Sequence, residues 1–295
     1  MWAGKTGVVP DLSPTLLRTD CGLPTFQIAL ASNLVMDWEE SWKKLVSDRA
    51  TLAGTHADPG YWDRRAPSFA RSTLARADEF LKVIDPYLSP RKTLIDAGAG
   101  AGRHAVPLSE RLEWVTAVEP SEGMRAQIPP RDNMTVVASS WEDAEVAPAD
   151  LVICCHVMYA VADPVPFIHK LEESARERVF IMLRETELPQ PAVAIRRQLV
   201  GTEAPRMPRF SDLFMLLLQM DVAPDVSFQR YNSVSRYADL DEAVADTRSV
   251  VGEGWDEAAG PAMLEKMLTR NGEDLVYDGG TVLTGVAHWQ PRARD

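Results

Sequence analysis

The sequence predicts an α/β fold: a doubly wound, mostly parallel seven-stranded sheet with an antiparallel last strand, plus helical cap elements. Two observations lead to this class. After Pro90, short β-rich runs alternate with helical runs at the spacing of strand-helix-strand units. The first of these strands runs directly into a glycine-rich turn, TLIDAGAGAGRH at residues 93–104. In a sheet of this kind, ligands bind beyond the carboxyl ends of the strands.

The composition and net charge of the chain bear on which partners it can bind. Its 295 residues are 45% hydrophobic and 25% charged, as in ordinary globular proteins. With 31 Lys and Arg against 43 Asp and Glu, the formal net charge is −12. This charge disfavours unselective attraction to nucleic acid or to anionic lipid, so we expect neither as a partner.

Cysteine usage and hydropathy predict a soluble, cytoplasmic protein. The cysteines are Cys21, Cys154 and Cys155, and the last two are neighbours whose geometry disfavours a mutual disulfide. The apolar segment 23–36 follows acidic residues and shows no small-residue cleavage site, so we do not interpret it as a signal peptide. No run approaches the roughly 20 apolar residues that a membrane span needs.

The N-terminal part is expected to be an extension followed by helices. Residues 1–22 are interrupted by prolines and glycine and show no sustained period, which predicts a loosely structured segment. Apolar residues then recur at helical spacing over about 25–50. A loop at 55–62 precedes a second helix that runs toward Leu81.

The central part supplies the parallel strands and the helices between them. The β-rich runs predict strands at 93–96, 114–118, 134–138, 151–155 and 178–183. The helical runs predict helices at 103–111, 121–127 and 163–175.

Beyond residue 183 the regularity lapses before two final strands. These are predicted at 226–231 and 281–289, with helices near 239–251 and 256–269 between them. The stretch 211–220 is apolar on nearly every side, which is typical of a buried helix. A homodimer contact or an apolar acceptor pocket is the alternative interpretation of that stretch.

The glycine-rich turn points to a particular kind of nucleoside. Gly98, Gly100 and Gly102 would let a ligand approach the backbone, but Arg103 stands where the dinucleotide fingerprint needs glycine. The Gly-Lys-Ser/Thr of a phosphate-binding loop is absent as well. Asp96 at the mouth of the turn would repel a pyrophosphate and attract a cation. S-adenosylmethionine is a cationic, phosphate-free adenosine, and Glu119 after the second strand could accept hydrogen bonds from its ribose.

Three motifs together resemble those of class I S-adenosylmethionine-dependent methyltransferases, which have a Rossmann-like fold. They are DAGAGAGRH, AVEPSEGM and SSWEDAE, and the resemblance covers about residues 91–183. The segment YWDRRAPSFA at 61–70 is similar to the helix that many small-molecule members place over the cofactor. The resemblance implies a methyltransferase domain at 61–295, with substrate-cap insertions within 185–280, after an N-terminal extension and helix at 1–60.

The resemblance also implies cofactor-binding residues. The methionine part would be held by Asp96 and by the backbone of Ala97, Gly98 and Gly100. The adenosine would be held by Glu119 at the ribose, Met124 against adenine, and Trp141 and Glu142 at the adenine edge, with Cys155 beside the cofactor. Arg65 would meet the methionine carboxylate and Phe69 would close the lid; the alternative is a surface helix packed on the sheet.

The loop after the fourth strand, CCHVMYAVADP at 154–164, is expected to face the methyl group. It lacks the Asn-Pro-Pro-Tyr type of signature found in enzymes that methylate exocyclic amines, which favours a small-molecule acceptor. His156 is the candidate general base, because imidazole titrates near neutral pH. Its alternative role is to orient the loop or stack on the cofactor. Tyr159 would donate to an acceptor oxygen or merely line the pocket.

The remaining histidines, Glu185 and a group of arginines bear on metal and substrate binding. The histidines His56, His104, His169 and His288 show no ligand spacing with one another or with the cysteines, so we expect no metal site. Glu185 is either an acceptor contact or a surface carboxylate. A local excess of arginines would meet a carboxylate or phosphate on the substrate, or form a solvated face; they are Arg184, Arg196, Arg197, Arg206 and Arg209.

The leading hypothesis is a methyltransferase that moves a methyl group from S-adenosylmethionine to an O, N or C nucleophile of a small molecule, releasing S-adenosylhomocysteine. A second hypothesis is a protein that binds the cofactor without transferring the methyl group. A third keeps the fold and changes the chemistry, as in a cyclase or a dehalogenase.

Overall fold

The computed structural model describes residues 36–51, 60–74, 79–201 and 204–292, together with two short strands nearer the N-terminus. The chain divides into two compact units, Met1–Asp37 and Trp38–Asp295. In the first unit, β1 (Leu17–Arg18) pairs antiparallel with β2 (Pro24–Thr25). Most of the segment predicted to be loosely structured, and residues 26–35 of the predicted first helix, lie outside the described residues.

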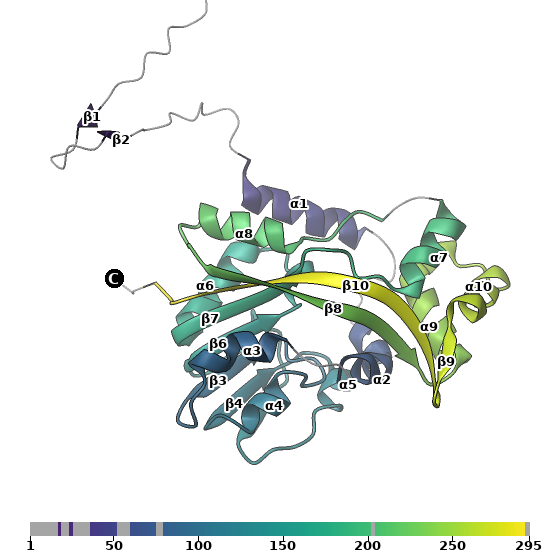
Figure 1. Cartoon of the computed structure of the whole chain (residues 1–295), viewed down its shortest axis with the longest axis horizontal. Helices are drawn as coiled ribbons and strands as arrows, with labels where there is room; N and C mark the ends of the chain where they lie inside the picture. Colours follow the sequence, from purple (N-terminus) through teal and green to yellow (C-terminus); the bar gives the residue numbers. More distant parts are fainter. Residues whose placement is uncertain are drawn as a thin grey trace, which may run out of the picture. The chain divides into compact units, whose positions relative to one another are not determined.

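The second unit contains the sheet that the sequence predicts (Figure 1). Its strands run in the order β5-β4-β3-β6-β7-β10-β8, and a short β9 pairs with β10. The bounds are β3 (Thr93–Ala97), β4 (Trp114–Val118), β5 (Met134–Val137), β6 (Ala149–Cys155), β7 (Ala175–Arg184), β8 (Asp225–Tyr237), β9 (Thr269–Asn271) and β10 (Asp274–Trp289). All seven predicted strands are present, whereas β9 was not predicted.

Strand directions confirm the mostly parallel sheet with an antiparallel last strand. β3 is parallel to both of its neighbours, with Asp96 opposite Ala117 of β4 and Ile153 of β6. β10 runs antiparallel to β7 and to β8, between which it lies. After β3 the chain adds strands on one side, then returns to add β6 on the other. A crevice therefore opens at the carboxyl ends of β3 and β6, where ligands of doubly wound sheets bind.

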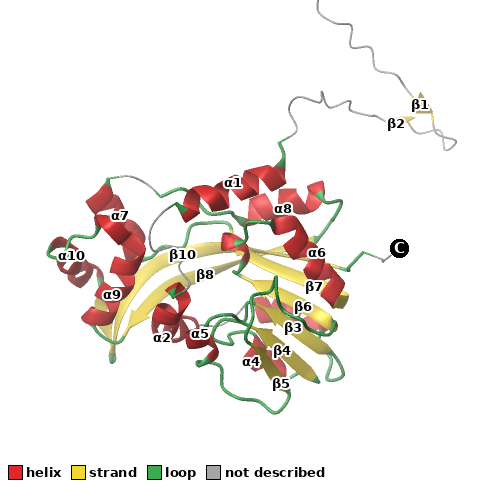
Figure 2. Ribbon diagram, turned by 180° about the vertical axis from the view of Figure 1, so that it is seen from behind, coloured by secondary structure: helices red, strands yellow, loops and turns green. Residues whose placement is uncertain are grey.

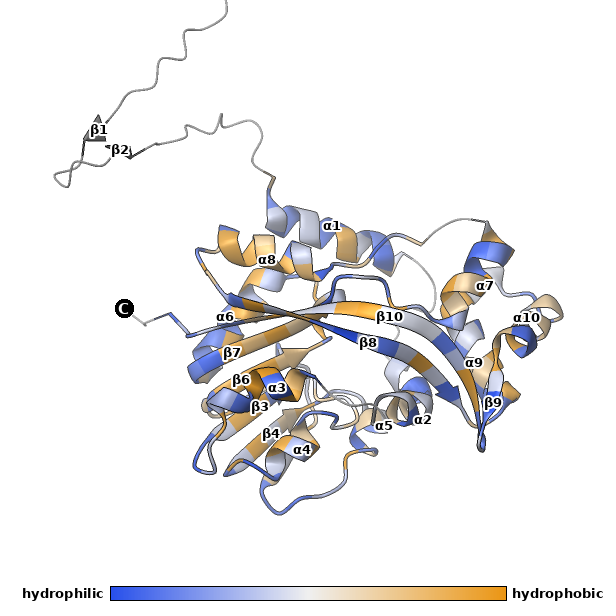
Figure 3. Ribbon diagram, in the orientation of Figure 1, coloured by the Kyte–Doolittle hydropathy of each residue, from blue (hydrophilic) through white to orange (hydrophobic). Residues whose placement is uncertain are grey.

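Alternating side chains give the sheet two buried faces. On β6, Val152 and Cys154 enter one core cluster, while Leu151, Ile153 and Cys155 enter the other. The first face is covered by α1 (Trp38–Ala50), α6 (Pro164–Ser174) and α8 (Phe210–Gln219), and the second by α3 (Phe80–Ile84) and α4 (Ala105–Ser109). Figure 3 shows hydrophobic residues along these strands, as expected where both faces are covered.

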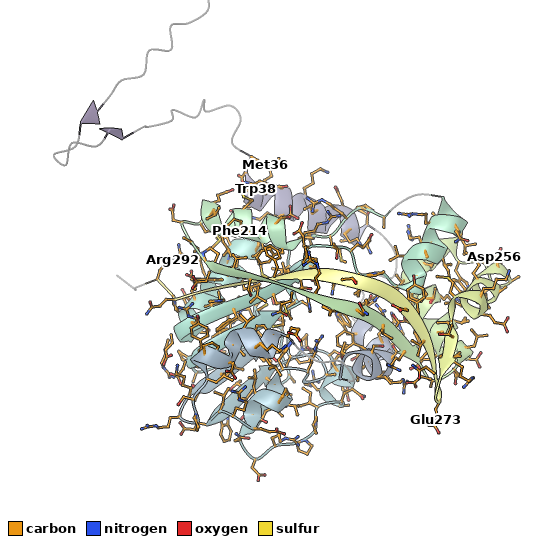
Figure 4. All side chains as sticks on the ribbon, viewed as in Figure 1. Met36, Trp38, Phe214, Asp256, Glu273 and Arg292 are labelled. Carbon is orange, nitrogen blue, oxygen red and sulfur yellow. The ribbon has the colours of Figure 1, made fainter. Side chains whose placement is uncertain are left out.

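The apolar stretch 211–220 is the buried helix that its composition predicted. Phe210, Leu213, Leu216 and Leu217 of α8 are buried in the core that α1 and the sheet share. A side chain at Gly285 of β10 would lie 2.3 Å from the ring of Phe210, so this glycine lets the helix approach the strand. Figure 4 labels Trp38 and Phe214, which also pack against this core.

β8 and β10 are long, curved strands that extend past the rest of the sheet and carry a helical cap (Figures 1 and 2). We define the cap as α7 (Pro191–Val200), α9 (Leu240–Val251) and α10 (Ala259–Met267). Its core is formed by Ala192, Ile195, Tyr237, Ala243, Val251, Leu264 and Leu268. Two of these helices match the predicted pair at 239–251 and 256–269, whereas α7 was not predicted.

Capping residues explain where the cap helices begin and end. Asp239 accepts the Glu242 backbone N–H at 2.8 Å and starts α9. Gly201, with φ 73°, ends α7 in the left-handed conformation that glycine adopts readily. The Asp256 carboxylate, labelled in Figure 4, accepts the backbone N–H groups of Ala258 and Ala259 just before α10, and these bonds lower its pKa.

Within the described residues, no helix has the length and apolar character needed to span a membrane.

Candidate functional site

A cavity of about 350 Å³ opens at the carboxyl ends of β3, β4 and β6. Its walls come from the glycine-rich turn, the loop after β6, the second half of β8, the cap, and the helix α2 (Tyr61–Leu74). The sheet edge that doubly wound folds use for ligands is therefore enclosed by elements far apart in the sequence.

The glycine-rich turn has backbone conformations that ordinary side chains disfavour. Gly98, Gly100 and Gly102 have φ values of 81°, 55° and 82°. A Cβ atom at Gly98 would lie 2.3 Å from a methyl group of Val157, whereas one at Gly100 would lie 3.7 Å from the Phe69 ring. The Gly98 and Ala99 N–H groups both donate to the Val118 carbonyl at 2.9 Å, which ties the turn to the end of β4.

Glu119 follows β4 and turns its carboxylate toward the glycine-rich turn. One oxygen accepts the Gly100 N–H and the other accepts the Ser121 N–H, each at 2.8 Å. The residue is 6% exposed and lines the cavity. Burial raises the pKa of Glu119, although these two backbone bonds oppose the shift. The remaining lone pairs of the carboxylate can accept two further donors.

Helix α2 covers this end of the cavity and is fixed to the short helix α5 (Glu122–Arg125). One oxygen of Asp63 accepts the Ser121 hydroxyl at 2.6 Å and the Gly123 N–H at 2.8 Å. These bonds lower the pKa of Asp63, with the Ser121 hydroxyl as the main cause. A Cβ at Gly123 would lie 2.9 Å from the Asp63 backbone, so glycine allows the two helices to approach.

The other side of α2 is fixed to the cap. Arg65 donates to Asp246 of α9 and to the Tyr61 hydroxyl, and the side chains of Arg65 and Asp246 are 12% and 7% exposed. Burial alone would lower the pKa of Arg65, but Tyr61 and Asp246 outweigh it and raise that pKa. Tyr237 also donates to Asp246, at 3.1 Å. The helix therefore joins α5, beside Glu119, to the cap.

The loop after β6 brings His156 and Tyr159 together. His156 has φ 63°, a strained value for a non-glycine residue of the kind that clusters at functional sites. Its Nδ1 lies 2.9 Å from the Tyr159 hydroxyl oxygen, which also accepts the Arg184 backbone N–H at 2.8 Å. The Arg184 guanidinium lies 4.3 Å from the centre of the Tyr159 ring. Burial raises the pKa of Tyr159 to about 12, so this hydroxyl stays protonated at neutral pH.

The cavity brings together most of the residues that the sequence singled out. Its lining includes Arg65, Phe69, Gly98, Gly100, Glu119, Met124, Cys155, His156 and Tyr159. Asp96, Ala97, Trp141 and Glu142 do not line it. Asp96 is 1% exposed at the end of β3, and Trp141 is 3% exposed beneath the Lys170 ammonium, 5.3 Å from its ring. The individual roles of all these residues stay predictions.

Several cavity residues were not found from the sequence. The predicted strand 226–231 continues to Tyr237, and its inward side chains line the cavity at Tyr231, Ser233, Ser235 and Tyr237. Their spacing of two residues was a signal that strand periodicity could have revealed. Of the arginine group, Arg184, Arg196 and Arg197 line the cavity. Arg206 instead pairs with Asp212, and Arg209 is the N-cap of α8.

Among the residues that the structure describes, no group of three or more His, Cys, Asp or Glu side chains is placed to hold a metal ion.

Residues 95–182 match the family described as "Methyltransferase domain". No curated protein matches the chain. Residues 95–182 therefore contain a methyltransferase domain, and the strand order of the sheet is that of the Rossmann-like fold that the sequence motifs predicted.

Solved structures of methyltransferases are similar to this chain at low identity. A putative methyltransferase from an antibiotic biosynthesis pathway of Anabaena variabilis shares 17% identity, with 76% of this chain and 98% of that chain covered and a TM-score of 0.49. The plantazolicin methyltransferase in complex with a pentazolic analogue and SAH shares 13%, covering 86% and 100%, with a TM-score of 0.48. The magnesium protoporphyrin IX methyltransferase of Synechocystis, with bound SAH, shares 13%, covering 85% and 99%, with a TM-score of 0.41.

Proposed function

We propose that this protein transfers the methyl group of S-adenosylmethionine to an O, N or C nucleophile of a small-molecule acceptor. One observation carries the proposal: a single cavity is lined by the glycine-rich turn and Glu119, by His156 and Tyr159, and by residues of the cap. A cofactor and an acceptor can therefore meet within one enclosed space.

The residues at the turn fit this cofactor. Glu119 is buried, yet it keeps lone pairs for the ribose hydroxyls, and the lack of a side chain at Gly98 lets the turn lie against Val157 of the loop that carries His156. Met124, 2% exposed, offers an apolar surface for adenine. When bound, S-adenosylmethionine supplies a methyl group on a positively charged sulfur, which is already activated for transfer to a nucleophile.

The remaining work of the protein is to align the reactants and exclude water. Helix α2 closes the cavity through its bonds to α5 and α9. In this proposal, Tyr159 and His156 contact the acceptor beside the methyl group, and the hydrogen bond between them holds both rings in place. When His156 Nδ1–H donates to the Tyr159 oxygen, Nε2 has the lone pair that can take a proton from the acceptor.

Replacing His156 with asparagine is expected to slow methyl transfer by about 10²- to 10⁴-fold if the imidazole acts as the base. Asparagine tolerates the positive φ at this position, so the loop should keep its shape. The measurement uses isotope-labelled S-adenosylmethionine and a small-molecule extract, with label transfer followed by mass spectrometry.

The exposed His169 on α6 provides the matched control, because His169→Asn should leave the rate unchanged. Binding of SAH should stay the same in both variants. Equal transfer rates in the wild type and His156→Asn would exclude a base at this position. Tight SAH binding with no label transfer to any extract would favour a protein that binds the cofactor without catalysis.

The raised pKa of Glu119 predicts how cofactor affinity depends on pH. Ribose hydroxyls donate to the ionised carboxylate, so binding of SAH should be strongest above the raised pKa and should weaken as pH falls through it. The stability of the free protein should change in the opposite direction. Glu119 stays protonated to a higher pH in the folded state than in the unfolded chain. The contribution of Glu119 to the free energy of unfolding therefore falls as pH rises from the ordinary glutamate pKa to the raised one.

Calorimetric titration with SAH across this pH range measures the effect. Glu119→Gln cannot ionise and should bind SAH about 10- to 100-fold more weakly, with a flat pH profile. Glu122→Gln, on the exposed side of α5, is the control and should keep the wild-type profile. A profile that Glu119→Gln leaves unchanged would contradict this role for Glu119.

A further inference from the structure

The cavity is rich in positive charge although the chain is acidic. Among the residues that the structure describes, six arginines and three carboxylates line it, in a protein of formal net charge −12. Two of the carboxylates have partners already: Glu119 accepts backbone N–H groups and Asp246 pairs with Arg65. Of the described lining residues, Arg49, Arg184 and Arg196 therefore outnumber the remaining carboxylate, Glu187.

Arg49 and Arg196 are held in place by backbone carbonyls. Arg49 Nη1 donates to the Pro205 carbonyl at 3.0 Å, and Arg196 Nη1 donates to the Val251 carbonyl at 2.8 Å. Both side chains line the cavity and are only partly exposed. Within the described ranges neither forms an ion pair with a carboxylate, and the Nε of Arg196 is buried without a hydrogen-bond partner. The two guanidinium groups keep donors for a ligand.

These two guanidinium groups also affect one another. Burial is the main cause that lowers the pKa of Arg49, and nearby Arg196 lowers it further while Glu187 opposes the shift. Like charges that are partly withdrawn from water are unfavourable unless an anion joins them. Arginine forks match the geometry of carboxylate and phosphate oxygens. Arg184 adds a third cation beside Tyr159, and none of its contacts in the described part of the chain is with a carboxylate.

We propose that the acceptor carries a carboxylate or phosphate group that Arg49 and Arg196 bind. The group that is methylated lies toward His156 and Tyr159, which follow β6, whereas the two arginines come from α1 and α7. The flat rings of Tyr159, Tyr231 and Tyr237 line the space and suit an aromatic or other planar body. The assignment of this anion to the acceptor rests on the proposed methyltransferase function.

The binding test uses simple anions on the SAH-saturated full-length protein. Benzoate and inorganic phosphate are titrated by calorimetry, with neutral benzamide as the uncharged control. Benzoate or phosphate should bind saturably and at least about tenfold more tightly than benzamide, and Arg196→Gln and Arg49→Gln should each remove this difference. Arg248→Gln, in an exposed pair with Glu257, should leave it intact.

Two results would overturn the anion site. One is that neither benzoate nor phosphate binds better than benzamide, and the other is that the anions bind equally well to Arg196→Gln and Arg49→Gln. Titration of each variant with SAH checks the fold of the cofactor site, since neither arginine is placed there. Arg196→Lys keeps the charge without the fork and should restore part of the affinity.

The acceptor test separates this inference from the proposed function. Extract is divided by anion exchange before it is incubated with the protein and labelled S-adenosylmethionine. Label should enter molecules of the retained fraction, and phosphatase treatment of that fraction distinguishes a phosphate acceptor, which loses activity, from a carboxylate. Transfer only into the unretained fraction would overturn the anionic acceptor while leaving the methyltransferase standing. Failure of SAH to bind would overturn the function instead, and the anion titration would still report on the site.

Discussion

Replacing Asp246 with alanine should lower the free energy of unfolding by about 3 to 5 kcal/mol, because it leaves the Arg65 guanidinium buried without its carboxylate. The Tyr237 hydroxyl loses its acceptor in the same variant. Since this pair joins α2 to α9, we expect α2 to separate from the cap before the rest of the protein unfolds. Urea unfolding followed by circular dichroism measures the loss, and hydrogen exchange of α2 measures the opening.

The exposed pair Arg248–Glu257 gives a matched comparison. Arg248 Nη2 lies 2.7 Å from Glu257 Oε1, but the two side chains are 59% and 65% exposed. Glu257→Ala should therefore lower the free energy of unfolding by at most about 1 kcal/mol. Replacing both buried partners, as Arg65→Met with Asp246→Leu, should recover much of the stability because no buried charge remains. An Asp246→Ala variant as stable as Glu257→Ala would show that the buried pair Arg65–Asp246 does not fix α2 to the cap.

Replacing Gly98 with alanine should abolish cofactor binding and destabilise the fold by about 2 to 5 kcal/mol. Two effects destabilise this variant. Alanine must adopt a left-handed conformation at φ 81°, and its methyl group would lie 2.3 Å from Val157. Relief of the contact would move the loop that carries His156 or the turn that faces the ligand. Thermal unfolding and SAH titration measure the two consequences.

Gly201 and Val157 allow the two costs to be separated. Gly201 has φ 73°, and among the described residues an added Cβ would meet nothing within 4 Å, so Gly201→Ala should show the conformational cost of about 1 to 2 kcal/mol alone. Combining Val157→Ala with Gly98→Ala should remove the steric cost. The destabilisation that Gly98→Ala then adds should be similar to that of Gly201→Ala. Equal destabilisation by Gly98→Ala and Gly201→Ala would refute the contact with Val157.

The sheet could be predicted from the sequence because its strands carry local signals. β3, β4 and β6 are buried on both faces, so they appear as short apolar runs between helical ones. The turn after β3 was predictable for a similar reason, since Gly98 and Gly102 have conformations that other residues rarely adopt. The position of Glu119 follows from the end of β4, and it reached the cavity as expected.

The cap could not be predicted in the same way, because its structure depends on contacts far apart in the sequence. The sequence predicted for Arg65 either a contact with the methionine carboxylate or a place on a helix packed on the sheet, but it gave no signal for the bond to Asp246, 181 residues later in the chain. β8 continues to Tyr237 because β10 pairs with it along its whole length, and neither strand alone shows that pairing. Arg49 had no local signal at all, since it enters the cavity through the packing of α1.

The central claim is that the glycine-rich turn takes a cationic, phosphate-free nucleoside. Calorimetric titration of the whole protein with SAH and S-adenosylmethionine, and separately with NAD⁺ and ATP, tests it most directly. We expect saturable binding of the first two at one site per chain, and no binding of the two phosphate-containing nucleotides that competes with SAH. Displacement of SAH by NAD⁺ or ATP, or no heat from SAH at millimolar concentration, would contradict the claim.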